Sequence, residues 1–222
     1  MVKSGQDCMN TFWIWAVALA LYGLFLAWYV NWRGPLTKAE VDAVMSRLEQ
    51  AGTGDDGRND RSVLRAFLEG DDGREFFMLN VIRFSDAPVA DPETGALKPA
   101  REVMEGYTKM FMPALFRRGG HPALAARKVG GLVDTWGLED RPDWSIMGYV
   151  RYRSRRDMAQ LVLNPKFSGA HAFKYAAMPQ TFNFPTQPMI MTLAGPRIWV
   201  ALTLALLAAG TQIVLLLSAL HH

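Results

Sequence analysis

Five polar side chains in the middle of the chain have the types that could do chemistry. They are Asn80, Arg83, His121, Tyr149 and Arg151. Arginine forks bind carboxylates and other anions, so Arg83 grouped with Tyr149 and Arg151 would form a ligand-binding site. His121 could act as a general base, and Asn80 and Arg83 are further catalytic candidates. An arginine that is buried only to pair with an acidic residue is the competing interpretation.

Metal and covalent chemistry has little support in the residue pattern. His121 and His171 lie about 50 residues apart and the chain has one cysteine, Cys8, so no ligand spacing predicts a metal site. The acidic loop over residues 52–60 lacks the spacing of a calcium loop and is interpreted as a turn. No nucleophile motif, phosphate loop or dinucleotide fingerprint occurs. The sequence therefore does not decide whether the chain is an enzyme. It favours a non-enzymatic role and predicts no cofactor.

The elements that would position these side chains follow one order. Hydrophobic patterning predicts strands over 76–84, 123–133, 143–152 and 188–193, with helices over 100–118, 155–163 and 168–177 between them. This βαββαβ order predicts an α+β, ferredoxin-like antiparallel sheet over residues 75–193. Alternation places Asn80 and Arg83 on opposite faces of the first strand. With both helices on one face, the other face needs a partner, such as an identical sheet in a homodimer or pseudo-dimer.

Two segments near the chain ends, 11–32 and 198–220, contain no Asp, Glu, Lys, Arg or His. A helix of about 22 residues reaches about 33 Å, enough to cross the ~30 Å core of a bilayer. Aromatic residues mark the expected membrane interfaces: Trp13, Trp15, Trp28, Tyr29, Trp32 and Trp199. The remaining parts are a tail over 1–10 and a helical section over 33–74, in which Thr37 and Glu40 predict a capping box.

The two apolar segments are expected to anchor and pack, because transport pathways need titratable groups at depth. Their small residues favour contacts with other membrane subunits, and lipid or pigment contacts are also expected there. Basic residues beside the segments favour a two-pass protein of a bacterial inner membrane with a cytoplasmic domain. The net charge of +3 is small and the arginine clusters lack interleaved aromatics, so nucleic-acid binding is not expected.

Part of the chain resembles a known family, DUF1330. The matching residues are FMLNVIRF (77–84), Tyr107, Gly119-Gly120, 144–152 closing on Arg151-Tyr152-Arg153-Ser154, and Met158 through Asn164-Pro165-Lys166-Phe167. The resemblance covers about half of the chain. It implies a dimeric α/β-barrel fold, in a superfamily that also holds antibiotic-biosynthesis monooxygenases, and it implies no particular activity.

Two functions are expected from these observations. The first is a membrane-anchored structural or accessory subunit of a larger complex, photosynthetic or respiratory, acting through helix packing and domain contacts. The alternative is a membrane-bound, monooxygenase-like enzyme that acts on a small hydrophobic molecule.

Overall fold

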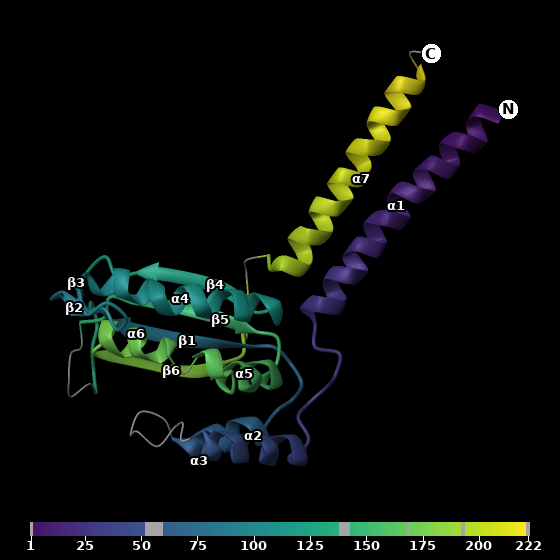
Figure 1. Cartoon of the computed structure of the whole chain (residues 1–222). Coiled ribbons are helices and arrows are strands. Elements are labelled where there is room, and N and C mark those ends of the chain that lie inside the picture. The colour runs from purple at the N-terminus through teal and green to yellow at the C-terminus, as the bar shows by residue number, and fades with distance from the viewer. Residues whose placement is uncertain (1, 52–59, 138–142, 168, 192–193, 221–222) are drawn as a thin grey trace. The chain divides into compact units, whose positions relative to one another are not determined.

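The chain forms two compact units, which Figure 1 shows in the computed structural model. The structure describes residues 2–51, 60–137, 143–167, 169–191 and 194–220. One unit comprises Met1–Val30 with Met189–His222, and the other is Asn31–Pro188. Most of the acidic loop over 52–60 lies outside the described residues.

The larger unit is built on a four-stranded antiparallel sheet with strand order β4-β5-β1-β6. Its strands are β1 (Phe76–Arg83), β4 (His121–Arg127), β5 (Ile146–Tyr152) and β6 (Gln180–Thr186). With α4 (Ala100–Arg117) after β1, and α5 (Arg155–Val162) and α6 (Ala170–Ala177) after β5, the order is βαββαβ. The predicted α+β, ferredoxin-like sheet is confirmed.

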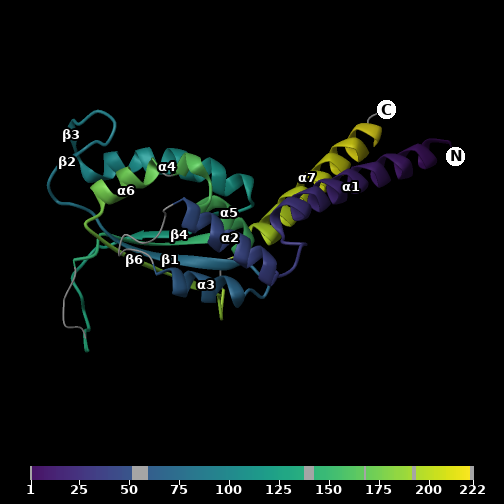
Figure 2. The ribbon, with the colours of Figure 1, turned by 60° about the horizontal axis from the view of Figure 1, so that its bottom comes forward.

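Figure 2 shows α4 and α6 on one side of the sheet. Side chains alternate along a strand, so every second residue of β1 faces these helices. Met78 packs against one buried cluster with Leu115 and Phe167, and Ile82 packs against a second with Val103 and Phe173. α4 and α6 therefore cover one face of the sheet and do not cover the other face.

The helices α2 (Lys38–Gln50) and α3 (Arg61–Glu69) share the core of the sheet domain. Val41 and Leu68 belong to the same buried cluster as Phe76 of β1. The predicted capping box forms, since the Thr37 hydroxyl accepts from the Glu40 N–H and Glu40 accepts from the Thr37 N–H. The domain boundary that the sequence predicts at residue 75 therefore falls inside a single hydrophobic core. The apolar stripe of α2 needs the sheet domain to cover it.

Arg156 of α5 fastens this helical section to the domain. Its guanidinium donates to both Glu40 carboxylate oxygens at 3.0 Å and to the carbonyls of Gly34 and Pro35. These bonds hold the pKa of Glu40 down, from an ordinary 4.5 to about 2, with the Thr37 N–H adding to the effect. Most of the donors of Arg156, which is only 8% exposed, thus have partners in this section.

The turn before β1 holds both ends of the domain. Asn31 donates to the carbonyl of Gly73 at 2.9 Å, and Gln187 donates to the Asp72 carboxylate at 2.7 Å. Gly73 has φ of +74°, and a Cβ there would lie 2.8 Å from the backbone nitrogen of Pro35, so the turn requires glycine. Asn31, just after α1, and Gln187, nine residues before α7, are therefore bonded to one turn.

Several element bounds differ from those that the sequence predicts. The fourth strand is Gln180–Thr186 and not 188–193, of which residues 192 and 193 lie outside the described chain. The second strand ends at Arg127, and beyond it Val129 and Trp136 are exposed. The register of β4 against β5 shifts between Pro122 and Leu124, as at a β-bulge. A short hairpin, β2 (Val89–Ala90) with β3 (Leu97–Lys98), occupies the expected loop after β1.

The smaller unit contains two helices, α1 (Val2–Tyr29) and α7 (Pro196–Leu220). Both are long and apolar enough to cross a membrane, over Met9–Tyr29 and Pro196–Ser218. Trp15 Nε1 donates to Gln212 Oε1 at 3.0 Å, and the Tyr22 hydroxyl donates to the Arg197 carbonyl at 3.0 Å. Two polar contacts thus link the helices, although neither has an ionisable side chain between residues 11 and 32 or 198 and 220.

Candidate functional site

The candidate site is the face of the sheet that points away from α4 and α6, called here the open face. Strand register and side-chain alternation define its members. Its central residues are Leu79, Val81, Leu124, Met147, Tyr149, Phe182 and Phe184. They come from all four strands, so the whole width of the sheet contributes.

Large apolar side chains on the open face are in contact with solvent. Phe182 and Phe184 of the edge strand β6 are 43% and 47% exposed, and Leu124 and Met147 are 44% and 37% exposed. The rings of Phe182 and Phe184 are parallel with centroids 6.2 Å apart, and Trp144 packs edge-on against Phe182 at 5.1 Å. A contiguous apolar surface of this kind is typical of a protein contact site.

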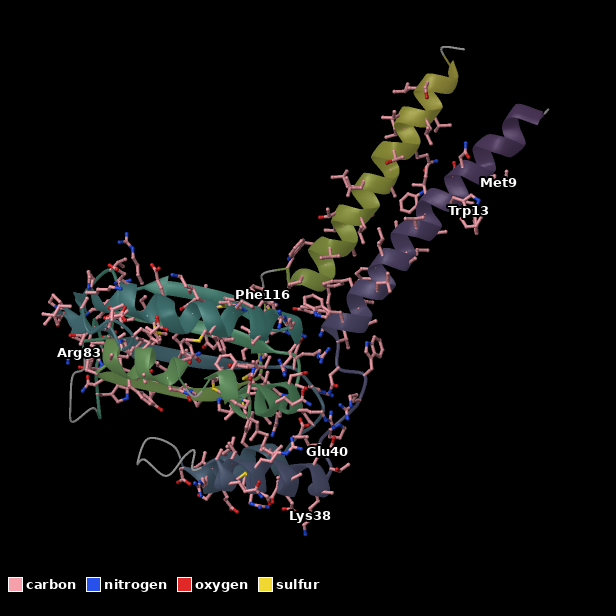
Figure 3. The ribbon with its side chains drawn as sticks, in the orientation of Figure 1. Met9, Trp13, Lys38, Glu40, Arg83 and Phe116 are labelled. Carbon is pink, nitrogen blue, oxygen red and sulfur yellow. The ribbon has the colours of Figure 1, made fainter. Side chains whose placement is uncertain are left out.

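Arg83 lies at one end of the open face, as Figure 3 shows. Its guanidinium is 3.4 Å from the side-chain oxygen of Gln180 and 3.9 Å from the Asp86 carboxylate. Its side chain is 36% exposed. Arg83 is therefore a charged group at the rim of the apolar surface.

Arg151 lies near the opposite end of the strands and is buried, with 1% of its surface exposed. Its Nε donates to Glu75 at 2.8 Å, Nη2 contacts the same carboxylate, and Nη1 donates to the Gly119 carbonyl. Within this one chain the geometry is that of a buried arginine paired with an acidic residue. Arg151 joins β5 to the residues before β1 and to the turn after α4.

The register separates Arg83 from Tyr149 and Arg151. Tyr149 lies opposite Leu79 and Arg151 opposite Phe77, four and six residues before Arg83. At about 3.3 Å per residue these offsets are roughly 13 Å and 20 Å along the strand. The predicted grouping of the three residues is wrong in geometry, because sequence alone does not give the strand register. The ligand-binding roles of the single residues stay predictions.

Asn80 and His121 lie away from each other. Asn80 shares the helix-facing side with Met78, to whose carbonyl it donates at 2.9 Å, so it is on the face opposite Arg83, as predicted. His121 starts β4 opposite Arg151, and its Nδ1 is 2.9 Å from the Pro122 carbonyl oxygen. That contact requires a proton on Nδ1. Asn80, Arg83 and His121 therefore do not surround one point.

The predicted interface aromatics have different surroundings. Trp13, Trp28, Trp32 and Trp199 are 60%, 41%, 69% and 53% exposed. Trp15 is 37% exposed and bonds to Gln212. Tyr29 is 4% exposed, stacks on Phe25 at 5.0 Å and lies 5.5 Å from the Arg197 guanidinium. Tyr29 is thus a packed residue, because its ring is covered by neighbours in the smaller unit.

The exposed aromatic residues of β6 are not among the site residues that the sequence predicts. The segment Thr181-Phe182-Asn183-Phe184 alternates polar and apolar residues, which is the signal of a strand with one apolar face. In this strand the apolar side points outward, away from the helices. Among the described residues, no group of three or more His, Cys, Asp or Glu side chains could hold a metal ion.

Three solved structures are similar to part of this chain, and one of them reaches a TM-score of 0.50. The methylated RPA0582 protein is 19% identical over 60% of this chain and 95% of its own, with a TM-score of 0.50. A second structure of RPA0582, a protein of unknown function from Rhodopseudomonas palustris, gives 17% identity over the same shares and a TM-score of 0.48. A putative antibiotic biosynthesis monooxygenase from Bacteroides thetaiotaomicron gives 14% identity, 55% and 96% coverage and a TM-score of 0.34.

The first of these likenesses, at a TM-score of 0.50, shows a shared fold alone. No family model matches the chain, and neither does any curated protein. Membership of DUF1330 therefore stays a resemblance.

Proposed function

We propose that this chain is a membrane-anchored accessory subunit that holds a ferredoxin-like docking domain in a larger complex. The exposed apolar open face is the observation that carries this proposal. Its aromatic and aliphatic side chains would gain from leaving water, at about 25 cal/mol for each Å² of apolar surface that a partner covers.

The paired apolar helices supply the proposed anchor. Their polar contacts, Trp15 with Gln212 and Tyr22 with the Arg197 carbonyl, are satisfied within the pair. The outward side chains, such as Leu24, Leu206 and Val214, are more than 60% exposed, so they are free to meet lipid or neighbouring membrane helices. We place the helices in a bacterial inner membrane with the domain on the cytoplasmic side, as the basic residues near the spans favour.

The partner proposed for the open face is a second copy of the sheet, from the same chain or a similar subunit. Two antiparallel sheets that pack face to face bury both apolar faces about 10 Å apart, which closes the face that α4 and α6 leave open. Membership in a photosynthetic or respiratory complex remains a prediction. The monooxygenase-like alternative also stays a prediction. Its candidate residues Asn80, Arg83 and His121 do not lie together among the described contacts.

Gentle detergent extraction of native membranes, with the chain as bait and mass spectrometry of what co-migrates, tests the proposal. We expect the chain in a particle with other membrane subunits. Recovery of the chain only as a free monomer or homodimer would remove the accessory-subunit proposal.

A pair of matched variants tests the open face itself. Phe182→Glu with Phe184→Glu places charges in the proposed contact, whereas Val63→Glu places one on α3, where Val63 is 64% exposed. We expect the double variant to lose the contact between sheets, measured by cross-linking in detergent, and the Val63 variant to retain it. Equal cross-linking in both, with far-UV circular dichroism unchanged, would exclude the open face as the docking surface.

A further inference from the structure

An uncharged, apolar connection joins β6 to α7. Between Lys174 and Arg197 the sequence contains no Asp, Glu, Lys, Arg or His. Within this stretch, Met189, Ile190 and Met191 are 99%, 87% and 55% exposed. A run of consecutive large apolar side chains at a surface is typical of a contact site, because single exposed apolar residues are common and runs of them are not. The three side chains therefore need a partner that removes them from water.

The contacts of Arg197 indicate where the headgroups of a membrane would lie on the smaller unit. Its carbonyl accepts from the Tyr22 hydroxyl at 3.0 Å, and its guanidinium lies 5.5 Å from the ring centre of Tyr29, the last residue of α1. Since Tyr29 is seven residues beyond Tyr22, the charged group extends toward the end of α1, as arginine side chains do near a membrane surface. Trp199, in the first turn of α7, is 53% exposed, and tryptophan favours the same level. The first turn of α7 is thus the expected headgroup level.

The length of the chain keeps the three apolar residues near this level. Met191 precedes Pro196, where α7 starts, by five residues, and Met189 precedes it by seven. A fully extended chain spans at most about 3.6 Å per residue, so these residues lie within about 18 Å and about 25 Å of the helix start. The headgroup region on each side of a bilayer is roughly 5–8 Å thick. The segment is therefore short enough to lie along the membrane surface beside α7.

The backbone of the segment favours the headgroup region over the hydrocarbon core. Residues 187–191 belong to no helix or strand, so their backbone groups need water or headgroup atoms as hydrogen-bond partners. Hydrocarbon offers none. The apolar side chains gain by leaving water, and both needs are met where the headgroups meet the acyl chains.

We propose that Met189, Ile190 and Met191 insert into the boundary between lipid headgroups and acyl chains and form an interfacial contact beside α7. The partner of this surface is lipid. Because the stretch is uncharged, the contact requires no anionic headgroup. This inference rests on the proposed membrane anchor and extends it, since it assigns a lipid contact to the connection as well as to the helices.

Depth-dependent fluorescence quenching tests the contact. The full chain with Cys8→Ser and Ile190→Cys is labelled with a nitrobenzofurazan dye and placed in phosphatidylcholine nanodiscs, whose lipids carry a nitroxide near the headgroup or near the end of the acyl chain. We expect stronger quenching by the shallow nitroxide than by the deep one, and little quenching by aqueous iodide. The nitroxide quenching should persist in 1 M salt, which screens charges beyond about 3 Å. Strong quenching by iodide without quenching by either nitroxide would overturn the proposal.

Matched positions and a second measurement complete the test. Val133→Cys, at a position of the larger unit that is 95% exposed, should be quenched by iodide several-fold more than position 190. Met189→Cys supplies a second labelled position where the Ile190 variant does not fold. Shielding of position 190 from iodide and from both nitroxides would indicate a protein partner and would also overturn the lipid contact.

Alkaline carbonate extraction of native membranes separates this inference from the proposed function. If the chain stays in the membrane while position 190 is open to iodide, the interfacial contact alone is excluded. If carbonate releases the chain, the membrane anchor is excluded together with the contact. We expect the chain to stay in the membrane and position 190 to be shielded by lipid.

Discussion

Arg151→Met should destabilise the domain far more than Arg83→Met, although both remove an arginine on the same side of the sheet. Arg151 is 1% exposed and bonds to Glu75, whose side chain is 23% exposed, and to the Gly119 carbonyl. Removing one partner of a buried pair costs roughly 3–5 kcal/mol. Because Glu75 keeps access to water, we expect the lower end, about 3 kcal/mol.

Arg83 provides the matched control. Its side chain is 36% exposed and its ionic partner Asp86 is 91% exposed at 3.9 Å, so its loss should change stability by less than about 1 kcal/mol. Glu75→Gln combined with Arg151→Met should recover at least about 0.5 kcal/mol, since it removes the unpaired charge.

Urea titration of the full chain in detergent micelles, followed by far-UV circular dichroism, measures these differences through the transition midpoint. A midpoint for Arg151→Met within error of that for Arg83→Met would refute the assignment of Arg151 as a structural residue. In that case, a weakly coupled arginine near the open face would again fit the ligand-binding role expected from the sequence.

Two further perturbations have defined outcomes. Gly106→Ala gains about 1 kcal/mol of helix propensity but places a Cβ 2.4 Å from the Phe173 ring, so overpacking of about 1–3 kcal/mol should give a net loss. Phe173→Leu in the same chain should relieve that loss, and Gly169→Ala, which has open space around it, should change the urea midpoint little. Glu40 has its pKa lowered by Arg156 to about 2 from an ordinary 4.5, so its stabilisation is present above pH 4.5 and is lost as the pH falls toward 2. Glu40→Gln should flatten the acid unfolding curve in that window, and an unchanged curve would contradict the bond.

The order of elements could be predicted because local chemistry fixes it. Thr37 and Ser154 cap helices at the expected residues, and the buried strand at Phe76 carries its own apolar pattern. Pro113 lies inside the helix predicted over 100–118, and α4 continues past it to Arg117. Helix packing in the core outweighs the lost hydrogen bond there.

The candidate site could not be assembled from the sequence for two physical reasons. Strand register sets which residues face each other, and it places Arg83 six positions from the partner of Arg151. The alternation of Phe182 and Phe184 indicates one apolar face without saying whether that face points inward or outward. Only the position of β6 at the sheet edge, with its apolar side away from α4 and α6, gives that direction.

The shared turn before β1 has a mechanical consequence. Asn31 comes two residues after α1, and Gln187 comes nine residues before α7. They bond to the neighbouring residues Gly73 and Asp72. A pull on either connection would therefore load the same turn first and pass directly into β1, in the centre of the sheet. The antiparallel bonds of β1 to β5 and β6 would share that force, so the domain should resist tension from its tethers better than if each tether ended on an edge strand.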